Sequence, residues 1–199
     1  MRTAFNQFLV NIEEIRKTHL ASVALAASLG GTKIIDFDNV KRSCIVLGVS
    51  ALDHYIHEIT VIGMIEIFRG IRAPTKKYLK HNVSLELVGN LSHSSPHAIF
   101  EAEIRKNLGW QSYQKPDKVK DAIALFSSTN LWQQVSLLMH DTEVNIKTQL
   151  SLIVDRRNMI AHEADIEPVY KTRRPISDAV VTTSIDFIEN VGTAISKII

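Results

Sequence analysis

The residues best suited to chemistry lie at positions 155–163, where the sequence reads Asp-Arg-Arg-Asn-Met-Ile-Ala-His-Glu. Asn158 directly follows Arg157, and His162 lies five positions after that arginine. A neutral imidazole can accept the proton of a ribose 2′-hydroxyl, and a guanidinium can stabilise charge that develops on a phosphate. Arg157 and His162 are therefore the residue types that metal-independent RNA cleavage needs, although this spacing also arises by chance in helices.

The segment around Arg157 has the apolar periodicity of a helix. Steps of four, three, seven and four positions connect the apolar residues Ile146, Leu150, Ile153, Ile160 and Ala164. Such steps place side chains on one helical face, and Arg157 fills the missing position of that stripe. A guanidinium on an apolar seam is costly unless it is paired or faces a water-filled cleft, which indicates that Arg157 has a specific role.

A straight helix does not aim Arg157 and His162 at one point. At 100° per residue, His162 lies about 140° around the axis from Arg157, on the face of Asn158 and Asp155. The helix could loosen near residue 160, the arginine could curl around it, or a two-fold dimer could bring one subunit's arginine near the other's histidine. We favour the dimer, with or without a curled arginine.

A purely structural interpretation is also open. Asp155, Arg156, Asn158 and Glu163 could form an ordinary solvated face, with Arg157 paired to an inner carboxylate such as Asp53 or Glu58. Spacing alone favours this structural interpretation over a catalytic one.

Composition sets limits on the class of protein. With 199 residues, 45% apolar and 22% charged, the chain suits one globular domain. Its net charge of +2 gives no general attraction to nucleic acid, so an RNA site must be a local patch. Cys44, the single cysteine, excludes an internal disulfide and a cysteine-based zinc site and fits a reducing cytosol.

No secretory signal or membrane span is predicted. Polar residues interrupt the N-terminal segment, and the best apolar run, 59–68, is shorter than the ~20 residues that a span needs and contains Glu66. We therefore expect a cytoplasmic protein with no membrane contact.

Apolar spacing predicts an all-α fold. Helices are expected over residues 3–29, ended by Gly30-Gly31; from a cap at Asp38 to about Arg69; 75–91; from the Ser95-Pro96 cap to Gly109; from Pro116 to Phe126; 131–139; from Asp141 or Thr142 to about Ala164; and Ser177 to the end. The β-branched residues in the second segment also suit a buried strand, but its length favours a helix. We predict one domain over residues 1–199, a helical bundle with an insertion of short helices in mid-chain.

The second long segment carries several polar residues of interest. His54, His57 and Glu58 share a helical face behind Asp53, which is a weak metal-site pattern. Helix packing, or support of the Arg/His site, is the favoured interpretation, because no distant third ligand is evident. We predict no metal and no cofactor.

Basic residues supply candidate phosphate contacts. Residues 69–81 contain Arg69, Arg72, Lys76, Lys77, Lys80 and His81 with no acid, and Tyr78 lies among them. Such a segment can bind single-stranded nucleic acid or be a solvated face, and neither is favoured. Arg173-Arg174 follows the motif closely. His93, Ser94, Ser95 and His97 suit a turn, and no Gly-rich phosphate loop is present.

The sequence Arg157-Asn158-x-x-x-His162 resembles the signature of the HEPN superfamily, which is Arg, four to six residues, then His. A polar residue, often Asn, follows the arginine in that family. Residues 154–163, 51–58 and 114–119 look most like the RiboL-PSP-type HEPN group of bacterial proteins. The motif also lies late in an all-α chain, before a connector and a last amphipathic helix.

The resemblance implies a dimer with two Arg/His motifs around one cleft at the subunit interface. Many members are metal-independent endoribonucleases of toxin–antitoxin, abortive-infection or antiviral systems. His162 would act as acid or base, Arg157 would stabilise the phosphate, and Asn158 would orient one of the two. Arg156, Arg173, Arg174, Lys76 and Lys77 are candidate RNA contacts, and Asp53, His57, Glu58 and Asp155 are candidate supporting residues.

Three functions follow in order of preference. The first is a homodimeric endoribonuclease of bacterial defence or a toxin–antitoxin-like module, with RNA as substrate and an antitoxin or defence protein as a candidate partner. The second is a non-catalytic HEPN-like module that binds a partner protein, RNA or a nucleotide. The third is a structural helical protein in which Arg157 forms a buried ion pair.

Overall fold

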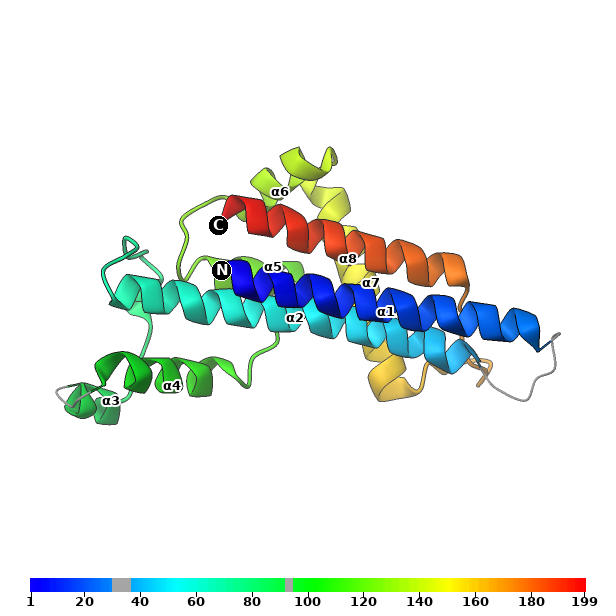
Figure 1. Cartoon of the computed structure of the whole chain (residues 1–199), viewed down its shortest axis with the longest axis horizontal. Coiled ribbons are helices and arrows are strands. Elements are labelled where there is room, and N and C mark those ends of the chain that lie inside the picture. The colour runs from blue at the N-terminus through cyan, green and yellow to red at the C-terminus, as the bar shows by residue number, and fades with distance from the viewer. Residues whose placement is uncertain (30–36, 92–94) are drawn as a thin grey trace.

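A computed structural model describes residues 1–29, 37–91 and 95–199, and its regular structure is helical (Figure 1). The α-helices are α1 (Arg2–Ser28), α2 (Phe37–Phe68), α3 (Leu85–Asn90), α4 (Pro96–Leu108), α5 (Pro116–Ile123), α6 (Leu131–Met139), α7 (Glu143–Glu163) and α8 (Asp178–Ile198). A 3₁₀ turn, η1, spans Tyr78–Lys80, and Ile166 and Arg173 form an isolated bridge. The all-α prediction is confirmed.

Three long helices form the body of the bundle. α1, α2 and α8 run alongside one another, and α7 crosses behind them (Figure 1). The predominantly apolar α2 contacts the other three and supplies fully buried residues such as Ile45, Leu52 and Ile56. The β-branched residues of this segment therefore lie in a central helix and not in a strand. They are buried because the neighbouring helices cover α2 on several sides.

The length and apolar character of α2 also satisfy the simplest test for a membrane span. Its most apolar 18 residues have a mean hydropathy of 1.3, and 56% of that window is buried in the protein. A core helix of a soluble protein passes the same test. Length and composition are therefore weak evidence for a span.

Short helices form the mid-chain insertion, as predicted. α4 packs against α2 and α3 packs against α4, around a second apolar cluster that includes Met64, Leu87, Phe100 and Ile104 (Figure 1). The single helix predicted over residues 75–91 is wrong. The chain is extended at His81, and the Ser84 hydroxyl accepts a hydrogen bond from Leu87 N, which starts α3 as a separate helix.

The helix ends near the motif follow local capping. Thr142 accepts a hydrogen bond from Asn145 N at the start of α7, and Ser177 accepts one from Val180 N at the start of α8. Asp38 lies inside the first turn of α2 and is not its cap, and α5 ends at Ile123, earlier than predicted. The proposed stop at Gly30-Gly31, together with His93 and Ser94, falls outside the described residues.

Glycine allows α8 to approach α1 closely. A Cβ atom at Gly192 would lie 2.4 Å from the ring of Phe8, which is itself 1% exposed. That distance is far below van der Waals contact. The packing of α8 against α1 therefore depends on the missing side chain at position 192.

Candidate active site

Arg157 lies on the inner stripe of α7, as the periodicity predicts. Ile146 and Leu150 are fully buried, Ile153 is 8% exposed, and Ile160 packs against the core. Arg157 itself is half-buried: its Nε is buried with no hydrogen-bond partner, and its Nη1 donates to Asn158 Oδ1 at 3.1 Å. Within the described chain, the guanidinium has no carboxylate partner.

The carboxylates suggested as partners of Arg157 are engaged elsewhere. Asp53 accepts hydrogen bonds from Tyr113 N at 2.6 Å and from Gln114 Nε2 at 2.9 Å. Glu58 accepts from Arg105 Nη1 at 2.6 Å, and this bond holds the pKa of the Glu58 carboxyl below its usual value. The suggestion that Arg157 forms an ion pair with Asp53 or Glu58 is therefore wrong.

His162 is exposed in the last turn of α7. The helix is continuous through residue 160 to Glu163, so the suggested loosening of α7 does not occur. The Asn158 side chain accepts a hydrogen bond from Arg157, and among the described hydrogen bonds none joins Asn158 to the imidazole. The two other arrangements, a curled arginine and a site shared between two subunits, remain predictions.

A buried carboxylate that we did not single out from the sequence fixes the end of α7. The Asp165 side chain is fully buried, and its Oδ2 accepts from Arg42 Nε and from Arg156 Nη2, each at 2.8 Å. Arg42 and Arg156 also donate to the Arg174 carbonyl, at 2.9 and 3.4 Å, and Arg156 donates to the Pro175 carbonyl at 3.0 Å. This cluster joins α2, α7 and the 164–176 connector.

The backbone after the motif adopts an unusual conformation. Ala164 and Asp165 have φ values of 51° and 60°, the left-handed region that is costly for residues with a Cβ. Such a conformation persists where the surroundings determine it. The two guanidiniums that bind the Asp165 side chain hold the backbone in this conformation, three residues beyond His162.

The charge of this cluster is positive. Burial lowers the pKa of the Arg156 guanidinium, Arg42 and Arg174 act in the same direction, and Asp165 opposes them. Two guanidiniums thus share one carboxylate beside the motif, and the charge of Arg174 also acts on Arg156. This excess of positive charge is a local field suited to a phosphate.

The remaining candidate RNA contacts differ in availability. Arg156 is committed to the Asp165 cluster, Arg174 Nη1 donates to the Ile166 carbonyl at 2.8 Å, and Arg173 is exposed and donates to Asn39 Oδ1 at 2.7 Å. Lys76 is exposed, and Lys77 pairs with Asp121 at 2.6 Å. Both lysines lie on the segment that precedes α3, not on α7.

The supporting candidates connect the motif helix to its neighbours. Asp155 forms an ion pair with Lys115, which follows directly on Gln114, a partner of Asp53. His57 Nε2 lies 3.0 Å from the Gln111 carbonyl and 3.8 Å from Asp53. Over the described ranges, no group of three or more His, Cys, Asp or Glu side chains is arranged to hold a metal.

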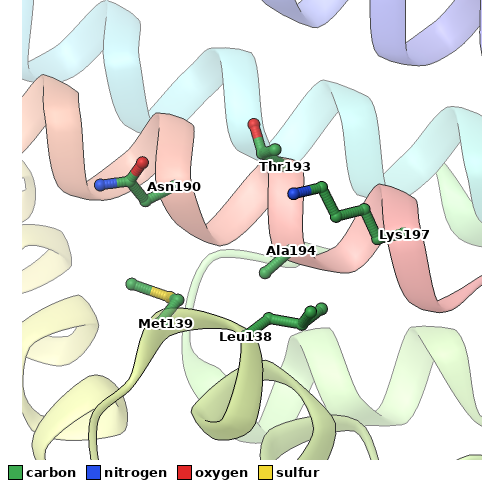
Figure 2. A pocket seen from close by; sticks show the side chains of 6 residues that line it. All are labelled: Leu138, Met139, Asn190, Thr193, Ala194 and Lys197. Carbon is green, nitrogen blue, oxygen red and sulfur yellow. The ribbon is translucent and has the colours of Figure 1, made fainter.

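A cavity of about 250 Å³ lies away from the motif, between the end of α6 and the C-terminal half of α8 (Figure 2). Leu138, Met139, Asn190, Thr193, Ala194 and Lys197 line it. Lys197 is its single ionisable side chain, and no acid–base pair is present there. The residues that line this cavity are therefore less suited to catalysis than those at the end of α7.

A comparison with protein-family models matched the RiboL-PSP-HEPN family over residues 8–199. The chain belongs to the RiboL-PSP-type HEPN family. No curated protein and no solved structure matched. The match covers the motif helix, the mid-chain insertion and α8, so it includes every candidate site residue.

Membership in this family indicates a nuclease or an RNA-related module. The sequence correctly pointed to the family through Arg157, Asn158 and His162. It gave no sign of Asp165 or Arg42, because Asp165 lies in a polar connector and Arg42 lies 123 positions before it.

Proposed function

We propose that this HEPN protein is a metal-independent endoribonuclease whose reacting groups are Arg157 and His162. The observation that carries the proposal is the half-buried Arg157 guanidinium, which is bonded to Asn158 and not to any described carboxylate. A half-buried cation without a counter-charge has no favourable purely structural role. A phosphate is a ligand that would balance this charge.

The chemistry follows from the two side chains. His162 in its neutral form removes the proton from the ribose 2′-hydroxyl, and the 2′-oxygen attacks the adjacent phosphorus. Arg157 stabilises the negative charge on the phosphoryl oxygens. The bond to the 5′-oxygen breaks and this oxygen receives a proton, which leaves a 2′,3′-cyclic phosphate and a 5′-hydroxyl.

The reaction needs both a base and an acid, and α7 offers one histidine five positions after Arg157. A two-fold homodimer with the motifs at the subunit interface supplies two histidines and two arginines to one cleft. It also removes the difficulty that Arg157 and His162 lie about 140° apart around one helix. We propose this dimer as the active form, in the cytoplasm, within a bacterial defence or toxin–antitoxin-like system.

The decisive experiment is RNA cleavage in EDTA by wild type, His162→Ala and a control, His54→Ala, in which an exposed histidine on α2 is removed. We expect wild type and the control to give 2′,3′-cyclic phosphate ends. His162→Ala should lose about 10²- to 10⁴-fold in rate, the usual contribution of general acid–base catalysis.

Cleavage by His162→Ala at the wild-type rate would refute the proposal, as would complete dependence on a divalent metal. If no variant cleaves RNA but wild type and His162→Ala bind it equally, the chain is a non-catalytic HEPN-like binding module instead.

A further inference from the structure

A groove of about 550 Å³ lies in the mid-chain insertion, outside the Arg/His site. Its walls come from the segment that begins at Lys77, from α4, and from Trp110 and Gln111 beyond the end of α4. It contains two lysines, the histidine His81, one carboxylate, several amides and one large aromatic side chain. No motif residue contributes to it.

Trp110 is the most unusual residue of the groove. It is 80% exposed, whereas Trp132 is 2% exposed and donates from Nε1 to the Pro116 carbonyl at 3.1 Å. An exposed indole offers a flat face on which an unstacked base can lie. Tyr78, the aromatic residue that the sequence suggested for this role, is partly buried against the core and is not available in the same way.

The charges of the groove are arranged on two sides. Lys77 and Lys80 lie at η1, with Lys77 also paired to Asp121, and they provide positive charge for phosphates. Glu103, on α4, is held by Ser84 N at 3.2 Å and Asn107 Nδ2 at 3.3 Å. These bonds hold the pKa of Glu103 below its usual value, and the bond with Ser84 has the largest effect. The ionised carboxylate can accept hydrogen bonds from the N–H groups of a base edge.

The groove is tied to the motif helix through the chain between α4 and α5. The Gln111 carbonyl contacts His57, and Tyr113 N and Gln114 are held by Asp53 on α2. Lys115 then pairs with Asp155, two positions before Arg157. An RNA strand that occupies the groove therefore lies on a segment that is held by α2 and paired with α7.

We propose that this groove binds one unpaired nucleotide of an RNA strand, with its base on Trp110, its phosphates at Lys77 and Lys80, and its base edge toward Glu103. The inference rests on the proposed function in naming RNA as the ligand. It concerns binding and not cleavage, so the two can be tested separately.

The test uses full-length protein carrying His162→Ala, so that the RNA stays intact, and a 12-nucleotide single-stranded RNA of mixed sequence. RNA should quench the tryptophan emission, and Trp110→Ala should abolish the quenching because Trp132 is buried. Trp110→Ala should also weaken binding about tenfold or more, the usual effect of removing one stacking partner, whereas Trp110→Phe should retain most of the affinity. Tyr170→Ala, which removes an exposed aromatic residue outside the groove, is the matched control.

Lys80→Ala gives an independent readout. Loss of one phosphate contact should reduce the slope of log affinity against log salt by about 0.7, the value for single strands. Equal affinity of Trp110→Ala and the Tyr170→Ala control would overturn the proposal, as would failure of the unmutated groove to bind RNA. Trp110-dependent self-association would also overturn it, because a second copy would then cover the groove. If wild type cleaves RNA and Trp110→Ala changes neither binding nor cleavage, the proposal for the groove fails while the proposed endoribonuclease function stands.

Discussion

Arg156 and Arg157 are adjacent in the sequence, but their guanidiniums have different surroundings. Arg156 donates to the buried Asp165 and to two carbonyls of the connector. Arg157 donates to the Asn158 side chain, and its Nε has no partner. The first arginine thus belongs to the framework, and the second retains capacity to bind an anion.

This difference predicts that the two sites contribute unequally to stability. Asp165→Ala leaves Arg42 and Arg156 without their shared carboxylate, and removing one partner of a buried ion pair costs about 3–5 kcal/mol. Arg157→Ala breaks no ion pair and should leave the free energy of unfolding nearly unchanged. Urea unfolding followed by circular dichroism measures both.

The control for Asp165→Ala is Asp155→Ala, which removes the exposed ion pair with Lys115 and should cost less than about 1 kcal/mol. Equal losses for Asp165→Ala and Asp155→Ala would contradict the role assigned to Asp165.

Arg157 also offers a test of anion geometry. In the RNA cleavage assay, Arg157→Lys keeps the charge but loses the planar fork of donors, and it should fall between wild type and Arg157→Ala. Arg157→Ala should reduce the rate about 10²- to 10³-fold, a typical loss for one oxyanion-stabilising donor. A wild-type rate in Arg157→Ala would exclude this residue from the reaction.

The place of Arg157 could be predicted from sequence because the apolar stripe of a helix is a local pattern. Its partner could not, since Asp53 and Glu58 were plausible by residue type alone and only the fold shows that Gln114 and Arg105 occupy them. The Asp165 cluster was missed for the same reason. A carboxylate in a polar connector is expected to be exposed, and only the fold shows that Arg42, from the distant helix α2, and Arg156 enclose Asp165.

At the scale of helices, most boundaries followed from capping residues and apolar spacing. α6 spans Leu131–Met139, the range that the sequence predicts, and α7 and α8 begin after Thr142 and Ser177. The failure at 75–91 has a local cause, because an extended His81 and a capping Ser84 divide the segment. Propensity alone does not locate such an interruption.

Helix packing gives a prediction at Gly192. Gly192→Ala places a methyl group against the ring of Phe8, and overpacking a tight core typically costs about 1–3 kcal/mol. Thermal unfolding should show a lower midpoint than wild type. Gly89→Ala is the control, because a Cβ there meets no atom within 4 Å and alanine favours the helix. A loss in Gly89→Ala as large as that in Gly192→Ala would contradict this account.

At the scale of the whole molecule, an ion pair joins the insertion to the bundle. Arg105 on α4 donates to both oxygens of Glu58 on α2, at 2.6 and 3.2 Å. The hydrogen bond from Arg105 lowers the pKa of Glu58 in the folded state, against an opposing effect of burial. The stabilisation is therefore complete above the ordinary carboxyl pKa of 4.5 and is lost as the pH falls below it toward the lowered pKa of the folded state.

Glu58→Gln should accordingly lower the stability at pH 7 and have less effect near pH 3. The loss of stability in the variant at pH 7 should be at most about 1 kcal/mol, because both side chains of the ion pair are partly exposed. Unfolding free energies of wild type and variant at a series of pH values measure it. A constant difference across this range would show that the pair contributes no charge-dependent stability.

The proposed dimer predicts that one defective chain inactivates its partner. The shared cleft uses both histidines, so a mixed dimer of wild type and His162→Ala lacks either the base or the acid. Random exchange of equal amounts should therefore leave about a quarter of the wild-type activity, which comes from dimers of two wild-type chains. An activity of about half, with mixed dimers verified by mass, would show that each subunit acts independently.

The reactivity of Cys44 can report how often the helical bundle opens. This residue is the chain's single cysteine, it is fully buried in α2, and its thiol lies 4.0 Å from the Ile15 carbonyl of α1, while burial raises its pKa. A thiol reagent can reach Cys44 when α1 separates from α2, so the labelling rate measures how often the bundle opens. Slower labelling in the presence of RNA would then report coupling between ligand binding and this opening, without any added probe.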